Sequence, residues 1–145
     1  MLCMAPMQSR KTARQAQGSA TDATHDSDVR IVSGNPATLE ALQAYFERVG
    51  IHARGAHAVR DLAIARDTRA VVLFPDDFDL VDVTARLRAL RHDHPRVLVV
   101  LVTRDPARVT AALGSDGHAR PLVVLPRPSF GWTILDAIRE HADAL

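Results

Sequence analysis

The sequence predicts an α/β fold: a doubly wound, five-stranded parallel sheet in a three-layer sandwich, with helices on both faces. Short apolar runs alternate with stretches whose apolar residues recur every three or four positions, and this alternation repeats five times after residue 28. The apolar runs lack polar alternation, which indicates strands covered on both sides. A length of 145 residues, with 47% hydrophobic and 24% charged residues, is ordinary for one globular domain.

Residues 1–27 are predicted to form a disordered N-terminal tail, and residues 28–145 the folded domain. The first segment is rich in Ala, Ser, Thr, Gln and Asp and has no sustained apolar period. Such a composition cannot bury enough apolar surface to offset the entropy cost of ordering the chain. Alternatively, the basic residues Arg10, Lys11 and Arg14 would make this segment a partner-binding arm.

The first strand and helix have the clearest signals. Residues 29–32 form a short apolar run. Asn35 is a suitable N-cap, and Pro36 suits the first helical position. Apolar residues then follow at spacings of three and four until Gly50, which is expected to end the helix.

The later elements follow from the same two patterns. A weak strand is expected at residues 51–54, a short helix at 57–65 and a strongly apolar strand at 70–74, which Pro75 ends. The remaining elements are a helix from about residue 80 to the positions before 95, a buried strand at 97–102, a helix at 106–113, a strand at 122–125 and a last helix built on Trp132, Leu135 and Ile138.

Composition excludes several classes of protein. The net charge of +1 argues against a nucleic-acid partner, which needs a concentrated basic face. Cys3 is the only cysteine, so neither an intramolecular disulfide nor a cysteine-rich zinc site can form. The longest apolar run, residues 97–102, is too short for a membrane span, and no signal peptide is evident. We therefore expect a cytoplasmic protein with no membrane or nucleic-acid partner.

Residues at the predicted strand ends carry a resemblance to a known family. Ser33 and Gly34 follow the first strand, where the family keeps two acidic residues. Thr103 follows the fourth strand at a Ser or Thr position, and Arg127-Pro128 follows the fifth at a Lys-Pro position. In this order of elements and motifs, almost the whole predicted domain resembles the receiver domain of bacterial response regulators. The resemblance implies the flavodoxin-like topology of receivers.

The departures from that family fall on the residues that carry its chemistry. Receivers are phosphorylated on an aspartate after the third strand with the help of Mg²⁺, and here Pro75 occupies the aspartate's place. Ser33 and Gly34 offer no carboxylate for the cation, which prefers anionic oxygen ligands. Val124 replaces the family's fifth-strand aromatic residue. The resemblance thus implies a degenerate site without cofactor or metal, made of Ser33, Gly34, Pro75, Thr103, Arg127 and Pro128.

Two acidic residues follow Pro75 and leave an alternative open. We expect Asp76 and Asp77 to lie in a solvated loop and to cap the helix that starts near Leu80, because carboxylates favour helix N-termini. Alternatively, a shift of one residue would make Asp76 or Asp77 the phospho-acceptor, and Mg²⁺ would then be required.

The sequence therefore predicts a stand-alone atypical receiver, or pseudo-receiver, that is not an enzyme. It would act in two-component, phosphorelay signal transduction by contact with a histidine kinase or another regulatory or effector protein. The resemblance places the partner surface, and a possible homodimer contact, on the fourth helix, fifth strand and fifth helix, with candidate residues Arg108, Arg120, Arg139 and Glu140.

Two other functions remain open at this point. The first is a phosphorylatable receiver that uses Asp76 or Asp77. The second is a small-ligand-binding or enzymatic α/β domain with its site near Ser33, Asn35 and Thr103, because ligands of such folds bind at the carboxyl ends of strands.

Overall fold

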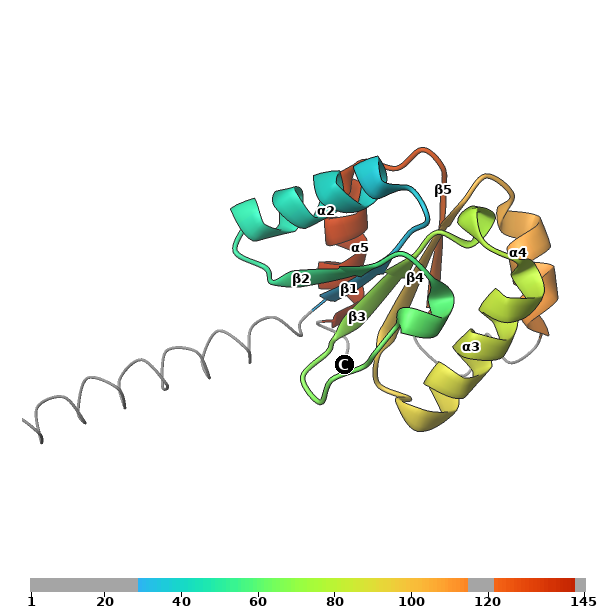
Figure 1. The fold of residues 1–145 in the computed structure, drawn as a ribbon. Helices are drawn as coiled ribbons and strands as arrows, with labels where there is room; N and C mark the ends of the chain where they lie inside the picture. Colours follow the sequence, from blue (N-terminus) through green and yellow to red (C-terminus); the bar gives the residue numbers. More distant parts are fainter. Residues whose placement is uncertain (1–28, 115–121, 143–145) are drawn as a thin grey trace, which may run out of the picture.

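A parallel sheet with the strand order β2-β1-β3-β4-β5 is the framework of this protein. The computed structural model describes residues 29–114 and 122–142 (Figure 1). The strands are β1 (Val29–Val32), β2 (Ala53–Ala56), β3 (Ala70–Leu73), β4 (Leu98–Thr103) and β5 (Leu122–Pro126). The α-helices are α2 (Pro36–Arg48), α3 (Leu80–Asp93), α4 (Pro106–Leu113) and α5 (Gly131–Ala142). The predicted fold class is confirmed.

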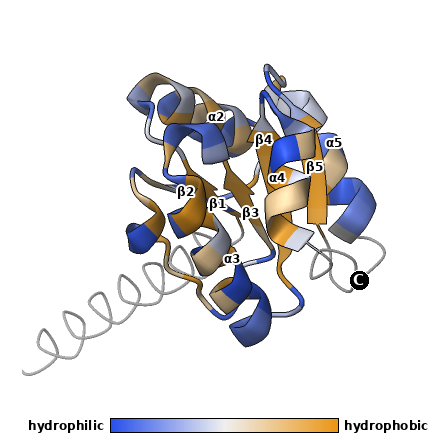
Figure 2. Ribbon diagram, turned by 90° about the vertical axis from the view of Figure 1, so that its right-hand side faces the viewer, coloured by the Kyte–Doolittle hydropathy of each residue, from blue (hydrophilic) through white to orange (hydrophobic). Residues whose placement is uncertain are grey.

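Successive residues of each strand point to opposite faces of the sheet and belong to two separate hydrophobic cores. On one face, Ile31, Val72 and Val100 pack with α2 and α5. On the other face, the neighbouring strand residues pack with α3 and α4, where Leu87 is fully buried. In Figure 2 the strands are largely orange, whereas the helices contain both orange and blue residues. The continuous apolar runs of the sequence thus reflect burial on both faces.

Helix α2 begins and ends where the sequence predicts. The Asn35 side chain accepts hydrogen bonds from the backbone N–H groups of Ala37 and Thr38. The chain leaves the helix through Gly50, whose φ of +87° is a conformation that L-residues with side chains rarely adopt. The buried face of α2 consists of Leu39, Leu42 and Phe46, as the spacing of three and four indicates.

The helix expected at residues 57–65 is not formed. The segment contains only a single 3-10 turn, η1 (Val59–Asp61), whose N-terminus has no side-chain cap. A short helix without a cap is marginal, because the first turn costs more entropy than one hydrogen bond returns. The apolar side chains still point inward, and Val59 and Leu62 are buried. Arg86 of α3 donates a hydrogen bond to the Leu62 carbonyl and holds this segment against the helix.

Strand β2 starts two residues later than expected. The register pairs Val29 with Ala53 and Ile31 with Gly55. This position of the strand must be glycine because Leu39 of α2 occupies the space that a side chain would need. A Cβ added at Gly55 would lie 2.6 Å from Leu39 Cδ1. A glycine that sequence propensity would place outside a strand is therefore required inside this one.

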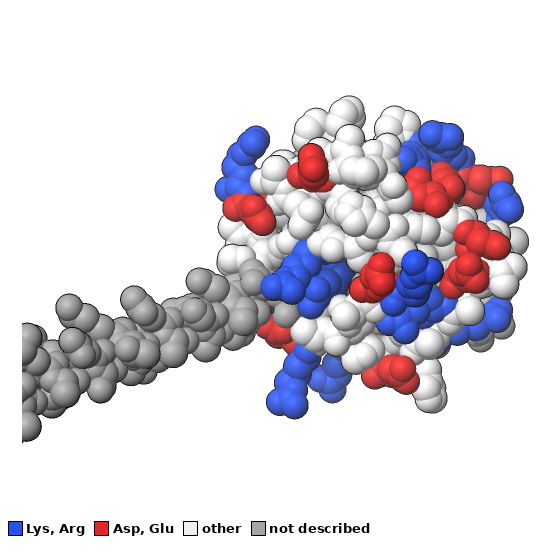
Figure 3. All heavy atoms as spheres, viewed as in Figure 1, with Lys and Arg blue, Asp and Glu red and all other residues white. Residues whose placement is uncertain are grey.

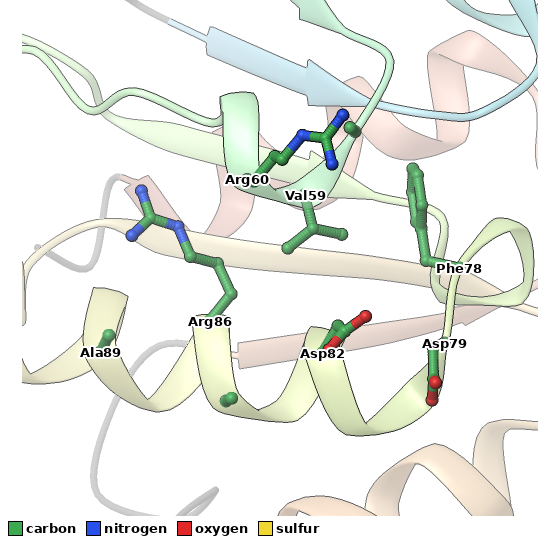
Figure 4. Close-up of a pocket in the computed structure, with 9 residues that line it drawn as sticks. Val59, Arg60, Phe78, Asp79, Asp82, Arg86 and Ala89 are labelled. Carbon is green, nitrogen blue, oxygen red and sulfur yellow. The ribbon is translucent and has the colours of Figure 1, made fainter.

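A hollow of about 600 Å³ lies between η1 and α3, next to the segment where a helix was expected. Val59 and Arg60 line it from η1, and Asp82 and Arg86 line it from α3 (Figure 4). The ring of Phe78 closes one end. The sheet beneath this hollow is still covered, because Val32, Val71 and Leu73 on the α3 face are fully buried.

Two expectations concern other parts of the chain. The predicted tail, residues 1–27, and Arg120 lie outside the described residues. Within the described ranges, no helix is long and apolar enough to cross a membrane.

Candidate functional site: the strand-end carboxylate pair

The candidate site lies at the carboxyl edge of the sheet, where β1, β3, β4 and β5 end. After β3 the chain makes a 3-10 turn, η2 (Pro75–Asp77), which presents two adjacent carboxylates. The ends of β4 and β5 lie next to each other, since Thr103 pairs with Pro126. The parallel arrangement therefore gathers polar residues from four segments that are distant in sequence. We call Asp76 and Asp77 the carboxylate pair.

Asp77 connects η2 to the loop after β1 and to the end of β5. Its Oδ2 accepts hydrogen bonds from Ser33 Oγ at 2.8 Å and from the Gly34 N–H at 3.1 Å. Its Oδ1 accepts from Arg127 Nη1 at 3.2 Å. A side chain at Gly34 would crowd this contact, because its Cβ would lie 3.3 Å from Asp77 Cβ. Ser33 and Gly34 are thus complementary to an acid on η2.

Asp76 connects η2 to the loop after β4. Its Oδ1 accepts a hydrogen bond from Thr103 Oγ1 at 2.6 Å, and its Oδ2 accepts from the Arg104 N–H at 2.8 Å. The Thr103 side chain is fully buried, and its oxygen also accepts a hydrogen bond from the Asp105 N–H at 3.1 Å. The position of Asp76 is therefore determined by groups that β4 holds in place.

Arg127 supplies the positive charge of the site. Its Nη1 lies 3.8 Å from Asp76 Oδ2, in addition to the hydrogen bond with Asp77. The guanidinium carbon lies 5.3 Å from the centre of the Phe74 ring, within the range of a cation–π contact. The Arg127 side chain is only 17% exposed, so these contacts are shielded from solvent more than a surface pair would be.

The surroundings of Asp76 favour its ionised form. Partial burial raises the pKa of the carboxyl group. The hydrogen bonds from Thr103 and from the Arg104 N–H, with the charges of Arg127 and Arg104, outweigh that effect and hold the pKa of Asp76 below its usual value of 3.8. Asp76 is therefore a carboxylate at neutral pH.

The expected role of the carboxylate pair as a helix cap is wrong. Helix α3 is capped by Asp79, whose Oδ1 accepts a hydrogen bond from the Val81 N–H. Asp76 and Asp77 precede the cap and turn toward the sheet edge, because hydroxyl, amide and guanidinium donors converge there. They form the centre of the site, although Asp76 is exposed and Asp77 half-buried, as expected for a solvated turn.

The other residues predicted at the degenerate site lie around the carboxylate pair. The structure brings Ser33, Gly34, Thr103 and Arg127 into direct contact with the carboxylates. Pro75 is buried at the start of η2, and Pro128 follows Arg127 next to the site.

Asn35 and the three described candidates of the expected partner surface make no hydrogen bond or ion pair with the carboxylate pair. The Asn35 side chain is used to cap α2. Arg108 is exposed on α4, and Arg139 and Glu140 are exposed on α5.

Sequence reasoning missed two features of this edge. The first is the Arg104 backbone N–H, since a main-chain donor leaves no signal in residue type. The second is a pair of exposed aromatic side chains, Phe130 and Trp132, in the β5–α5 loop and the first turn of α5. The helical spacing of Trp132 with Leu135 suggested that it faces the sheet, but its side chain is 55% exposed.

The chemistry of the edge is that of a filled anion site. Each of the four carboxylate oxygens of the pair accepts a hydrogen bond from a side chain or a backbone amide. Among the described residues, no group of three or more His, Cys, Asp or Glu side chains is arranged to hold a metal ion. The hydrogen-bond donors of this edge are suited to negatively charged oxygens, and the side chains of Asp76 and Asp77 supply those oxygens.

Comparison with solved structures identifies the fold. The chain is similar to the signal receiver domain of an HD domain-containing protein from Pseudomonas fluorescens, with a TM-score of 0.67 and 19% identity over 81% of this chain and 98% of that one. It is similar to a CheY-like response regulator receiver domain protein from Methanospirillum hungatei, with a TM-score of 0.68 and 15% identity over 81% and 94% of the two chains. A sensor protein from Polaromonas matches with a TM-score of 0.60 and 19% identity over 81% and 96%.

No protein-family model matches the sequence, and no curated protein matches it. The likeness is therefore one of architecture, that of a five-stranded parallel sheet with helices on both faces. The protein has the fold of response regulator receiver domains.

Proposed function

We propose that this receiver-fold domain is a protein-binding module of bacterial signal transduction, an atypical receiver that acts without being phosphorylated and without catalysing a reaction. One observation carries the proposal: the donors at the carboxyl edge already bind the two carboxylates of η2. A phosphoryl group bound here would have to displace them. It would also bring further negative charge next to Asp76, whose surroundings hold its pKa below the usual value.

The loop after β1 gives independent support. Mg²⁺ needs several oxygen ligands, and aspartyl phosphorylation needs such a cation to neutralise charge on the transferred group. Gly34 presents an N–H donor to Asp77, and an N–H group cannot bind a cation. The Ser33 hydroxyl donates its hydrogen to the same oxygen. This loop is therefore arranged to hold a carboxylate and not a metal ion.

A phosphorylatable receiver is the second candidate. Asp76 and Asp77 lie at the end of β3, and Thr103 and Arg127 contact them. In that case a carboxylate oxygen would attack the phosphorus of the donor, the bond to the leaving group would break, and Mg²⁺ would offset the charge. The partner would be a histidine kinase or another phosphodonor.

A small-ligand or enzymatic site near Ser33, Asn35 and Thr103 has less support. Thr103 lines a cavity of about 280 Å³ between η2 and α4, together with Asp76, Arg104 and Arg108. Ser33 and Asn35 do not line this cavity. The Asn35 side chain also satisfies the N-terminus of α2, so a ligand would have to compete with the helix for it.

Intact-mass spectrometry tests the proposal directly. The full chain is incubated with Mg²⁺ and acetyl phosphate, beside a phosphorylatable receiver as a positive control. We expect the control alone to gain the mass of a phosphoryl group. A gain in this protein that is lost in Asp76→Asn or Asp77→Asn, but kept in the matched α3 variant Asp82→Asn, would overturn the proposal in favour of the phosphorylatable receiver.

A further inference from the structure

A groove of about 540 Å³ lies between α2 and the segment that joins β5 to α5. Leu42, Tyr45 and Arg48 line it from α2, on one helical face. Arg127, Phe130 and Trp132 are among the residues that line it from the other side. We call this the aromatic groove. Its volume is typical of sites that enclose a small ligand or a few side chains.

The outer wall of the groove is an exposed pair of stacked rings. The centres of the Phe130 and Trp132 rings are 4.4 Å apart, with an angle of 8° between their planes. The two side chains are 61% and 55% exposed. Adjacent exposed aromatic residues are characteristic of protein interfaces, where such residues contribute much of the binding free energy.

The groove is rigidly supported. The Phe130 carbonyl accepts hydrogen bonds from the Thr133 and Ile134 N–H groups, so the backbone that carries the two rings is held in the first turn of α5. Tyr45 packs directly on Gly131, where an added Cβ would lie 2.7 Å from the Tyr45 ring. A preformed groove binds with a smaller loss of conformational entropy than a mobile one.

The charges that line the groove are both positive. Arg127 is already paired with Asp77. Arg48 makes no ion pair with another described residue, and its guanidinium is available to an incoming anion. In Figure 3 the surface over the β5–α5 loop is largely white, a few red and blue side chains lie over α2, and more lie over α3. An apolar groove with an unpaired cation is complementary to an apolar side chain next to an acid.

We propose that the aromatic groove binds an acidic segment of a partner protein, with a bulky apolar side chain seated between α2 and the Phe130–Trp132 pair and a carboxylate of the segment facing Arg48. This inference deepens the proposed function and rests on it, since it specifies how the domain contacts its partner. It differs from the surface expected on α4, β5 and the later part of α5, because it uses α2 and the start of α5.

The protein carries its own probe of this groove. Trp132 is the only tryptophan of the chain and Tyr45 its only tyrosine. Peptides are selected from a random display library on the full chain, with counter-selection on Phe130→Ala. Selected peptides are then titrated while the emission of Trp132 and its quenching by acrylamide are followed. We expect enrichment of Asp or Glu near Leu, Ile, Phe or Trp, and protection of Trp132 from the quencher.

Matched variants locate the binding site. Phe130→Ala should weaken peptide binding at least about fivefold, as for an anchor residue. Arg48→Gln should weaken it about two- to fivefold, as for an exposed ion pair. Arg108→Gln on α4 and Val81→Ala on α3 remove an exposed charge and an exposed apolar side chain outside the groove. These two controls should leave binding unchanged.

Several results would overturn the inference. The selection would contradict it if no peptide bound the wild type more tightly than Phe130→Ala, or if basic peptides were enriched. The titrations would contradict it if Arg48→Gln and the wild type bound the selected peptides equally well. A concentration-dependent change of Trp132 emission without peptide would assign the groove to a second copy of the chain. Phosphorylation in the mass assay would instead refute the proposed function while the peptide results stood.

Discussion

At the scale of single residues, the main feature is the way two adjacent carboxylates are held by separate groups of donors. Each has its own set of donors, Thr103 and the Arg104 amide for Asp76, Ser33 and the Gly34 amide for Asp77. Arg127 lies near both. Hydrogen bonds to a carboxylate are stronger than those between neutral groups, and they offset the repulsion between the two charges.

Thr103→Val removes one donor of Asp76 while nearly keeping the shape of the side chain. Loss of a buried hydrogen bond to a charged group should lower the free energy of unfolding at pH 7 by about 1.5–3 kcal/mol. The pKa of Asp76 lies below its unfolded value, so the stability gained from its ionised form is present above that value, about 3.8. It is lost as the pH falls through the folded pKa.

Urea unfolding at neutral pH and at about pH 3 tests this. The difference between wild type and Thr103→Val should narrow at the lower pH. Thr84→Val is a matched control, because the Thr84 hydroxyl bonds only to the Val81 carbonyl within α3, and it should change stability by less than about 0.5 kcal/mol. An equal effect of the two variants, or a difference that widens in acid, would contradict the assignment.

At the scale of the elements, local signals in the sequence predicted those parts of the fold that local interactions stabilise. Helix α2 has a cap, a proline at its first position and a buried face at helical spacing, and its boundaries agree with the prediction. The segment at residues 57–65 has apolar residues at suitable positions but no cap, and only η1 forms. In this segment the apolar spacing agrees with the side chains that are buried, but the predicted helix is wrong, because no cap stabilises its first turn.

Asn35→Ala should lower the free energy of unfolding by about 1 kcal/mol, because the Ala37 and Thr38 N–H groups lose their acceptor. Chemical denaturation measures this, with Glu40→Ala on the exposed side of α2 as the control.

Asn35→Ala also distinguishes a role of Asn35 in ligand binding from a role as a helix cap alone. If Asn35 served a ligand site, the change would abolish ligand-dependent stabilisation. If it only caps α2, it lowers stability by the same amount with or without nucleotide or phosphate in the sample.

At the scale of the whole molecule, the arrangement depends on contacts between residues far apart in the sequence. Ser33 and Asp77 are 44 residues apart, and Arg127 and Asp77 are 50 residues apart. The sequence predicted that strand ends would meet at one edge. It did not predict that Asp76 and Asp77 would turn toward this edge, because that direction is determined by donors that only the folded sheet brings together.

The packing of α2 on the sheet gives a further test at this scale. Gly55→Ala would place a methyl group 2.6–2.9 Å from the end of the Leu39 side chain. Because several Leu39 atoms are this close, we expect a loss of about 1–3 kcal/mol in the free energy of unfolding. Leu39→Val in the same chain should recover part of it, as a double-mutant cycle would show. If the two substitutions changed the free energy of unfolding additively, contact with Leu39 would not be the reason that position 55 is glycine.

The carboxylate pair has a spectroscopic consequence. The Gly34 and Arg104 amides donate to side-chain oxygens, one to Asp77 and the other to Asp76. The nuclear magnetic resonance signal of the Arg104 amide should therefore move when Asp76 is protonated. Because the pKa of Asp76 is held below its usual value of 3.8, the midpoint of this movement in an acid titration should also lie below 3.8. A backbone proton thus reports the ionisation of a neighbouring side chain in the unlabelled native protein.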